Sequence, residues 1–107
     1  MSNQNLKYQM DTEENRRFLK ELREELLFFG KCFPSPGGGS YYLGDDGTPW
    51  TERSRETWIT SRMAHVYSMG AMLGFEGGSE LAEAAIRGLA GELYDKENGG
   101  WYAGLTC

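Results

Sequence analysis

The chain has 107 residues, a formal net charge of −5 and a hydrophobic content of 39%. This length permits one small domain and excludes two domains with separate cores. Eleven basic residues stand against sixteen acidic ones and form no cluster, which argues against a nucleic-acid partner. The apolar runs are too short to span a membrane, so no membrane association is predicted.

The N-terminal residues Met1–Lys7 contain no apolar signal core, which predicts a cytoplasmic protein. Cys32 and Cys107 are isolated, with no CxxC pattern and no histidine at metal-ligand spacing. We therefore expect free thiols in a reducing compartment and no metal site.

Residues 1–11 show no periodicity and predict a flexible tail. Asp11-x-x-Glu14 resembles a capping box and predicts a helix that runs to about Phe29, with Gly30 at its end. Apolar residues at helical spacing form one face of this helix: Phe18, Leu19, Leu22, Leu26 and Phe29. The opposite face is dense in Glu and Arg, which predicts a solvent-exposed surface.

Residues 34–50 cannot be helical, because they contain Pro34, Pro36 and the run Gly37-Gly38-Gly39. Within them, Asp45-Asp46-Gly47 predicts a tight turn between two short extended pieces. The acidic pair lacks the alternating oxygen ligands of an EF-hand loop, so a solvent-facing turn is the better interpretation. The glycine run lacks the Gly-Lys-Ser/Thr ending of a phosphate-binding loop.

A second helix is predicted from about Ser54 to Leu73, with Gly74 ending it. At about 100° per residue, five of its residues fall within an arc of roughly 80°: Trp58, Arg62, His65, Met69 and Met72. Arg62 is the exception on this face, because an unpaired guanidinium among apolar groups costs several kcal/mol. The face therefore predicts either an internal acid partner or a polar ligand held in a pocket.

Trp58, Arg62 and His65 together supply a stacking ring, a fork of donors and a titratable group. These are the parts of a site for a sugar or another small polar metabolite. A core tryptophan and a core histidine with satisfied hydrogen bonds are the alternatives, and periodicity alone does not choose between them.

A third helix is predicted from Ser79, a good N-cap, to about Tyr94, and residues 95–105 predict a turn that enters a short strand. Its small residues Gly88 and Gly91 allow close contact with another helix. The apolar residues that it is expected to bury are Leu81, Ala82, Ala85, Ile86, Leu89 and Leu93.

The pattern is helix, hairpin-bearing loop, helix, helix and the start of another hairpin. It predicts an all-α fold, a partial (α/α)6 barrel of about three helices joined by loops with short β-hairpins. Residues 12–107 are expected to form the N-terminal portion of that barrel domain. The chain stops at Cys107, five residues after the aromatic pair Trp101-Tyr102. We interpret this end as an interruption of the predicted barrel.

Two segments carry a family resemblance: WITSRMAHVYS (58–68) and GGWYAGL (99–105). With them the chain resembles the N-acylglucosamine 2-epimerase superfamily over residues 12–105, and is most similar to its aldose–ketose isomerase branch, which includes mannose and sulfoquinovose isomerases. The resemblance implies an (α/α)6 barrel whose central pocket binds a free monosaccharide. It also implies proton transfer between neighbouring carbons through an enediol intermediate, with histidines as acid and base and no metal or cofactor.

By the same resemblance, Arg62 matches the pocket arginine that grips the sugar oxygens near the reacting carbons, in a catalytic and substrate-binding role. Trp58 matches the tryptophan that shapes the pocket one turn earlier. A fixed cation beside a developing enediolate stabilises charge in the transition state. The resemblance assigns no catalytic role to His65, the single histidine of the chain, because the family's proton-transfer histidines lie on later helices.

The sequence therefore predicts the N-terminal part of a cytosolic sugar isomerase or epimerase that is inactive alone. Its open edge is expected to expose Trp58, Met69 and Met72 to water or to another chain, which makes a homo-oligomer possible. The alternative is a non-catalytic helical module that self-associates through this face. A glycoside hydrolase needs two carboxylates across the scissile bond, and Asp45, Asp46 and Glu56 form no convincing pair.

Overall fold

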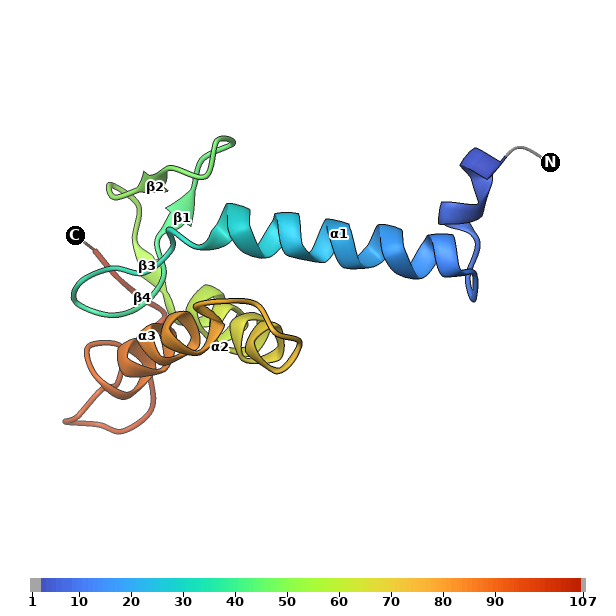
Figure 1. The fold of residues 1–107 in the computed structure, drawn as a ribbon. Coiled ribbons are helices and arrows are strands. Elements are labelled where there is room, and N and C mark those ends of the chain that lie inside the picture. The colour runs from blue at the N-terminus through green and yellow to red at the C-terminus, as the bar shows by residue number, and fades with distance from the viewer. Residues whose placement is uncertain (1–2, 107) are drawn as a thin grey trace.

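The computed structural model describes residues 3–106, with side chains from residue 6 onward. The elements, in chain order, are the 3-10 helix η1 (Asn3–Tyr8), α1 (Glu13–Gly30), β1 (Tyr42–Leu43), β2 (Pro49–Trp50), β3 (Arg55–Glu56), α2 (Thr57–Met72), α3 (Gly78–Ala90) and β4 (Gly104–Leu105). The prediction of three helices with short antiparallel strand pairs is confirmed. The molecule measures 61 × 26 × 21 Å, because α1 extends away from the body formed by the strands, α2 and α3, with η1 at its far end (Figure 1). Among the described residues, no helix is long and apolar enough to cross a membrane.

Helix α1 begins under a different cap from the one predicted. Thr12 is the N-cap, and its Oγ1 accepts a hydrogen bond of 3.0 Å from the Asn15 N–H. Asp11 precedes the cap in a left-handed conformation, with φ 64°, so the capping box on Asp11 was wrong. Upstream of it, where no regular structure was predicted, η1 packs on α1: the Tyr8 ring meets Phe18 edge-on at 5.5 Å.

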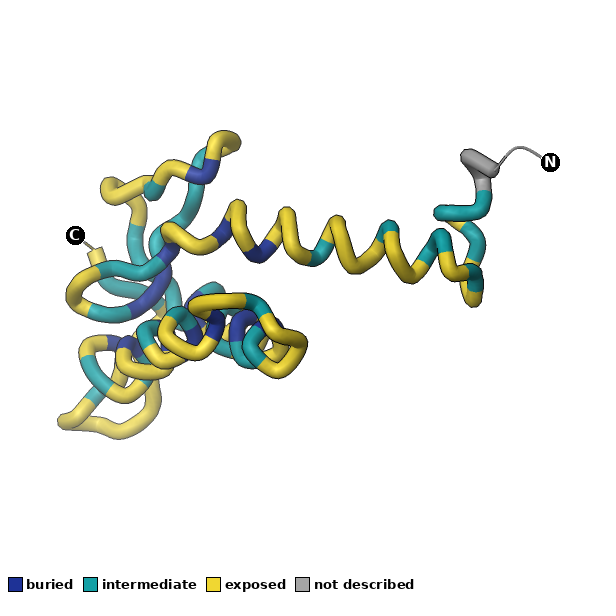
Figure 2. The backbone as a smooth tube through the Cα atoms, viewed as in Figure 1, coloured by how far each residue is buried: buried dark blue, intermediate teal, exposed yellow. Residues whose placement is uncertain are grey.

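Apart from its contact with η1, α1 packs against the rest of the chain only through its C-terminal part (Figure 2). Leu27 and Gly30 are its buried residues, and both lie near Tyr67 or Gly70 of α2. The apolar face predicted for this helix is instead largely exposed, with Leu19 at 51% and Leu26 at 61%. The contact with α2 is made by a different side of α1 from the one that the spacing of its leucines predicted.

The core lies between the end of α1, the loop after it, and the α2–α3 pair. Its buried members are Leu27, Phe33, Tyr67, Ala82 and Ala85. Helices α2 and α3 approach closely at Gly78, where a Cβ would lie 2.9 Å from the Ala71 backbone nitrogen. Of the residues expected to be buried on the third helix, Ala82, Ala85 and Leu93 are buried. Leu81 and Leu89 are partly buried, and Ile86 is half exposed.

Distant strand pairing changes the predicted helix bounds. Helix α2 begins at Thr57 rather than Ser54, because Arg55 and Glu56 pair with Leu105 and Gly104 of β4. No local pattern predicts a partner so far along the chain.

The third helix also differs at both ends from its prediction. Gly77, with φ 83°, is the N-cap, so Ser79 lies inside α3 rather than capping it. The helix ends at Ala90, because the Gly91 backbone leaves the helical conformation with ψ −109°. Further along, Tyr94 forms a bridge with Trp101. That bridge closes the turn predicted after residue 95.

The hairpin turn predicted at Asp45-Asp46-Gly47 is confirmed. Strands β1 and β2 pair antiparallel, and the Gly47 N–H donates to the Gly44 carbonyl at 2.9 Å. The Asp46 carboxylate accepts from the Thr48 N–H at 2.9 Å, which lowers the pKa of Asp46. Cys32 is an exposed free thiol, as predicted, and Cys107 lies outside the described residues.

Tyr67 gives the core a pH-dependent element. It is 1% exposed and its hydroxyl donates to the Leu27 carbonyl at 2.6 Å. Burial, with a smaller contribution from Cys32, raises its pKa from 10.0 to about 12. A pKa that is raised on folding contributes stability that is complete below pH 10 and is lost as the pH rises toward 12.

We therefore expect the free energy of unfolding to fall by roughly 2–3 kcal/mol between pH 10 and 12 on account of this one hydroxyl. Urea unfolding of the parent and of Tyr67→Phe across this range tests it. The variant is less stable at neutral pH, since the Leu27 carbonyl loses its partner, but its stability declines less steeply with pH. Parallel declines in the two proteins would contradict the prediction.

Candidate functional site

Helix α2 has two faces with opposite roles. Its buried side contains Thr60, Tyr67 and Gly70, which lie about 120–180° from the centre of the predicted stripe. The exposed stripe, as we call it from here on, consists of Trp58, Arg62, His65, Met69 and Met72. All five are exposed in this chain, with Trp58 at 50%, Met69 at 49% and Met72 at 85%.

The exposure predicted for Trp58, Met69 and Met72 is thus confirmed. Arg62 lies in solvent rather than among core side chains, so the desolvation penalty expected of a core position does not apply to it here. The internal acid partner that one interpretation of Arg62 required is therefore not needed for the fold.

Trp58 and Arg62 form a contact one helical turn apart. The Arg62 Cζ lies 5.0 Å from the centre of the indole, within the range of a cation–π interaction. Together they offer a flat apolar ring beside a planar fork of N–H donors. The structure brings these two predicted site residues together at the N-terminal end of the exposed stripe.

Glu56 and Tyr42 form a hydrogen-bonded group with Trp58. The sequence did not identify them as partners of Trp58. The indole Nε1 of Trp58 donates to Oε2 of Glu56, and the Tyr42 hydroxyl donates to the same oxygen at 2.9 Å. These hydrogen bonds, that from Trp58 foremost, lower the pKa of Glu56, while the bond to Glu56 raises the pKa of Tyr42. The Arg53 guanidinium lies 4.1 Å from the centre of the Tyr42 ring.

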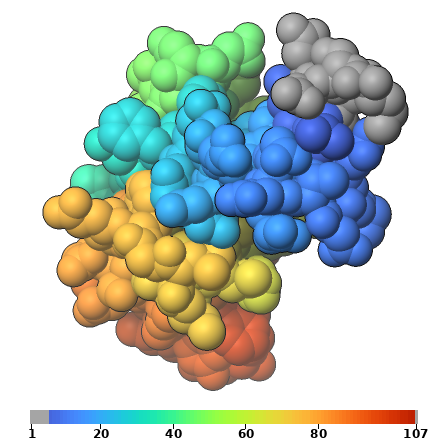
Figure 3. Space-filling view, turned by 45° about the vertical axis from the view of Figure 1, so that its right-hand side comes forward, coloured from blue at the N-terminus to red at the C-terminus, as the bar shows by residue number. Residues whose placement is uncertain are grey.

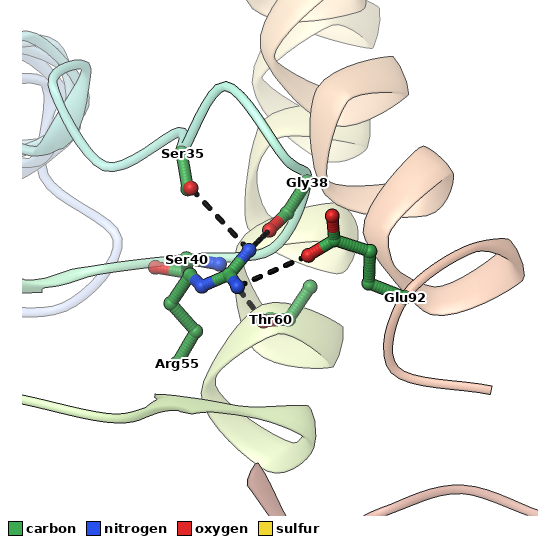
Figure 4. Close-up of polar contacts among 6 residues, drawn as sticks. All are labelled: Ser35, Gly38, Ser40, Arg55, Thr60 and Glu92. Atoms are coloured by element: carbon green, nitrogen blue, oxygen red, sulfur yellow. Dashed lines mark hydrogen bonds and ion pairs between the residues drawn. The ribbon is translucent and has the colours of Figure 1, made fainter. Parts of the chain in front are cut away.

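The first turn of α2, which carries Trp58, is connected through Thr60 to the loop that contains Gly37-Gly38-Gly39 and Ser40, called the glycine-rich loop below (Figure 4). The Thr60 Oγ1 accepts from the Ser40 N–H at 3.0 Å and donates to the Glu56 carbonyl at 2.8 Å. Thr60 and Ser40 are both fully buried. A buried hydroxyl with both roles satisfied fixes the loop and the start of the helix relative to one another.

Arg55 connects the same loop to Glu92, two residues after the end of α3. Its Nη1 donates to the Gly38 carbonyl at 2.6 Å, and its Nη2 lies 3.0 Å from Oε2 of Glu92 (Figure 4). The Arg55 side chain is only 13% exposed, whereas Glu92 is half exposed. The hydrogen bond to the loop is therefore the better-shielded part of this contact.

The space-filling view (Figure 3) shows the hairpin and the α2–α3 pair on opposite sides of α1. The β1–β2 hairpin, green in Figure 3, stands on one side of α1, and the yellow and orange surface of α2 and α3 lies on the other. Among the described residues, no three side chains of His, Cys, Asp or Glu come together as a metal site.

Residues 38–106 match the model of a protein family described as N-acylglucosamine 2-epimerase (GlcNAc 2-epimerase). The chain belongs to this family. The matched segment includes Trp58, Arg62 and Glu56, and the resemblance carried by residues 58–68 and 99–105 is thereby confirmed.

Two curated relatives place the chain in the mannose isomerase branch. It is 35% identical over 91 residues to the D-mannose isomerase of Thermobifida fusca, which covers 85% of this chain and 22% of that protein. It is 34% identical over 80 residues to the D-mannose isomerase of Pseudomonas cannabina pv. alisalensis, with 75% and 19% covered. The chain therefore spans about a fifth of the length of these relatives.

Proposed function

We propose that this chain supplies Trp58 and Arg62 to the sugar pocket of a cytosolic isomerase or epimerase that acts on free monosaccharides. The observation that carries the proposal is the Trp58–Arg62 pair, exposed on α2 within the segment that matches the family. A substrate related to D-mannose follows from the names of the two relatives. The indole would take the apolar C–H face of the sugar, and the guanidinium would take its oxygens.

The proposed reaction consists of proton transfers alone and needs no oxidant. A base removes the proton from C2 of the aldose while O1 gains a proton, which leaves an enediol. For isomerisation, O2 then loses its proton and C1 gains one, which gives the ketose. For epimerisation, C2 gains a proton on the opposite face while O1 loses the proton that it took up, which gives the C2 epimer of the aldose. Arg62 would stabilise the negative charge that develops on the oxygens between these steps.

The proton transfers need groups with pKa values near neutrality within reach of C1 and C2. In this proposal those groups lie on further helices, which together with α1, α2 and α3 complete an (α/α)6 barrel around the exposed stripe. Trp58 and Arg62 would bind the sugar, and Arg62 would polarise its oxygens, but neither residue would transfer a proton. We therefore expect the isolated chain not to interconvert sugars.

A chimera tests this function directly. The chain replaces the segment that it matches in the Thermobifida fusca D-mannose isomerase, and conversion of D-mannose to D-fructose is followed together with exchange of the C2 proton in D2O. The chimera is expected to show both activities, and the isolated chain neither. Proton exchange catalysed by the isolated chain would contradict the expected division of roles. A folded chimera that neither binds nor converts sugar would contradict the proposed pocket.

The same experiment addresses self-association as the second candidate. A specific observation favours it, at a surface that contains no residue of the exposed stripe: the exposed leucines of α1 and Val66 of α2 line a shallow apolar groove of about 310 Å³ with Arg23 and Leu27. A chain that forms a stable oligomer by light scattering, and that supports no activity in the chimera, would favour this non-catalytic role.

A further inference from the structure

Glu56 occupies the N-cap position of α2 without capping it. N-cap residues are mostly Ser, Thr, Asp or Asn, whose side chains accept a hydrogen bond from a backbone N–H in the first turn. The Glu56 side chain makes no such bond. Its carboxylate turns away to other partners, so capping does not explain a glutamate at this position.

The carboxylate instead accepts hydrogen bonds from residues of three segments. Its Oε2 accepts from Trp58 of α2 and from Tyr42 of the β1–β2 hairpin, and Ser54 Oγ lies 3.4 Å from Oε1. A charged acceptor makes such bonds stronger than neutral ones. The lowered pKa of Glu56 keeps the carboxylate ionised, and therefore a pure acceptor, at neutral pH.

Trp58 needs such a contact because packing holds it only in part. Half of its surface is exposed, and exposed side chains change rotamer on fast timescales. A hydrogen bond at Nε1 selects the rotamers that place the indole near Glu56. In that orientation the indole lies 5.0 Å from the Arg62 guanidinium.

We propose that Glu56 is a positioning residue, whose carboxylate holds the Trp58 indole against Arg62 in the orientation that binds the sugar. The inference rests on the proposed function. Glu56 acts through Trp58 and touches neither the sugar nor the reacting carbons. The main chain of Glu56 has a separate role, because its carbonyl accepts a hydrogen bond from Thr60 Oγ1 at the start of α2. Every substitution of the Glu56 side chain keeps this main-chain carbonyl.

The test measures solvent exchange of the indole N–H groups of the 107-residue chain by NMR, with signals assigned by Trp→Phe variants. Glu56→Asp is the informative variant. It keeps the charge and is a better N-cap, but its carboxylate is one methylene shorter. We expect the Trp58 indole to exchange about tenfold faster, which corresponds to roughly 1.4 kcal/mol for one lost charge-assisted hydrogen bond.

Two controls accompany this measurement. The indole of Trp101 donates to the Leu89 carbonyl at 2.6 Å, and its exchange should not change in any variant that folds. Tyr42→Phe removes the other donor to Oε2 and should leave Trp58 protected. Glu56→Leu should repeat the effect of Glu56→Asp. Unchanged Trp58 exchange in Glu56→Asp, with Trp101 also unchanged, overturns the proposal.

The chimera separates this inference from the function on which it rests. Glu56→Asp is expected to raise the KM for D-mannose about tenfold and to change kcat less, because it loosens binding without removing Arg62. If the parent chimera turns over sugar and Glu56→Asp leaves KM unchanged, the positioning role is overturned and the proposed function stands. If the parent chimera binds no sugar, the proposed function fails and the substrate role of Glu56 fails with it, whatever the indole exchange shows.

Discussion

Replacement of Arg62 by alanine is expected to lower kcat/KM of the chimera about 10²- to 10³-fold, or roughly 3–4 kcal/mol of transition-state stabilisation. Negative charge grows on the sugar oxygens as the enediolate forms, and a fixed guanidinium interacts with that charge more strongly than with the neutral substrate. Most of the loss should therefore fall on kcat. Steady-state kinetics with D-mannose measures it, and Trp58→Ala should lose less because it removes contact surface rather than charge.

Arg87→Ala is the matched control for this prediction. Arg87 is also an exposed helical arginine, but it pairs with Glu83 on α3 at 3.3 Å, away from the exposed stripe. A surface pair at this spacing contributes about 0.3–0.5 kcal/mol to stability, so activity should be unchanged. Equal activity of Arg62→Ala and the parent chimera would remove Arg62 from the site.

Gly88→Ala is expected to destabilise the fold by about 3 kcal/mol, although alanine is the better helix former. A Cβ at Gly88 would lie 2.1 Å from the backbone nitrogen of Gly39 and 2.6 Å from its Cα. Backbone atoms cannot rotate away as a side chain can, and Gly39 itself has φ 89°. The glycine-rich loop would have to leave α3, which also strains the contact between Arg55 and the Gly38 carbonyl.

Gly70→Ala on α2 serves as the control for Gly88→Ala, with both measured by urea unfolding. The nearest atoms to a Cβ at Gly70 are methyl groups of Leu27 at 3.2 Å, which can shift by a few tenths of an ångström. The gain in helix propensity, about 1 kcal/mol, offsets that strain. A Gly88→Ala variant as stable as the parent would show that the loop does not pack on α3 as described.

Much of the fold could be predicted from local sequence. The Asp45-Asp46-Gly47 turn was predicted because its residues match the backbone conformations that a tight turn requires. The three helices were predicted from apolar spacing, and the ends of the first two from glycines, to within a few residues. Errors arose where a residue distant in the sequence determines the local structure. Arg55 and Glu56 were predicted to be helical, but they form a strand because β4 pairs with them.

The exposed apolar face of α1 also shows that local sequence cannot predict a contact with a distant element. Leu19, Leu22 and Leu26 recur at the spacing of a buried face, yet they remain largely exposed in the described residues, while Leu27 packs in the core. Periodicity shows that a face is apolar, but it does not identify which element covers it.

For the site, the sequence by itself determined the family, through the residues of 58–68 and 99–105, and it placed Trp58 and Arg62 on one side of a helix because helical geometry is local. Only the tertiary structure decided that Thr60 and Tyr67 are the residues through which α2 packs, and that the carboxylate of Glu56 joins Trp58 to Tyr42 of the hairpin. The physical reason is distance along the chain. A helix turn brings residues four apart together by its own geometry, whereas Tyr42 meets Glu56 only once the glycine-rich loop has packed on α2 and α3.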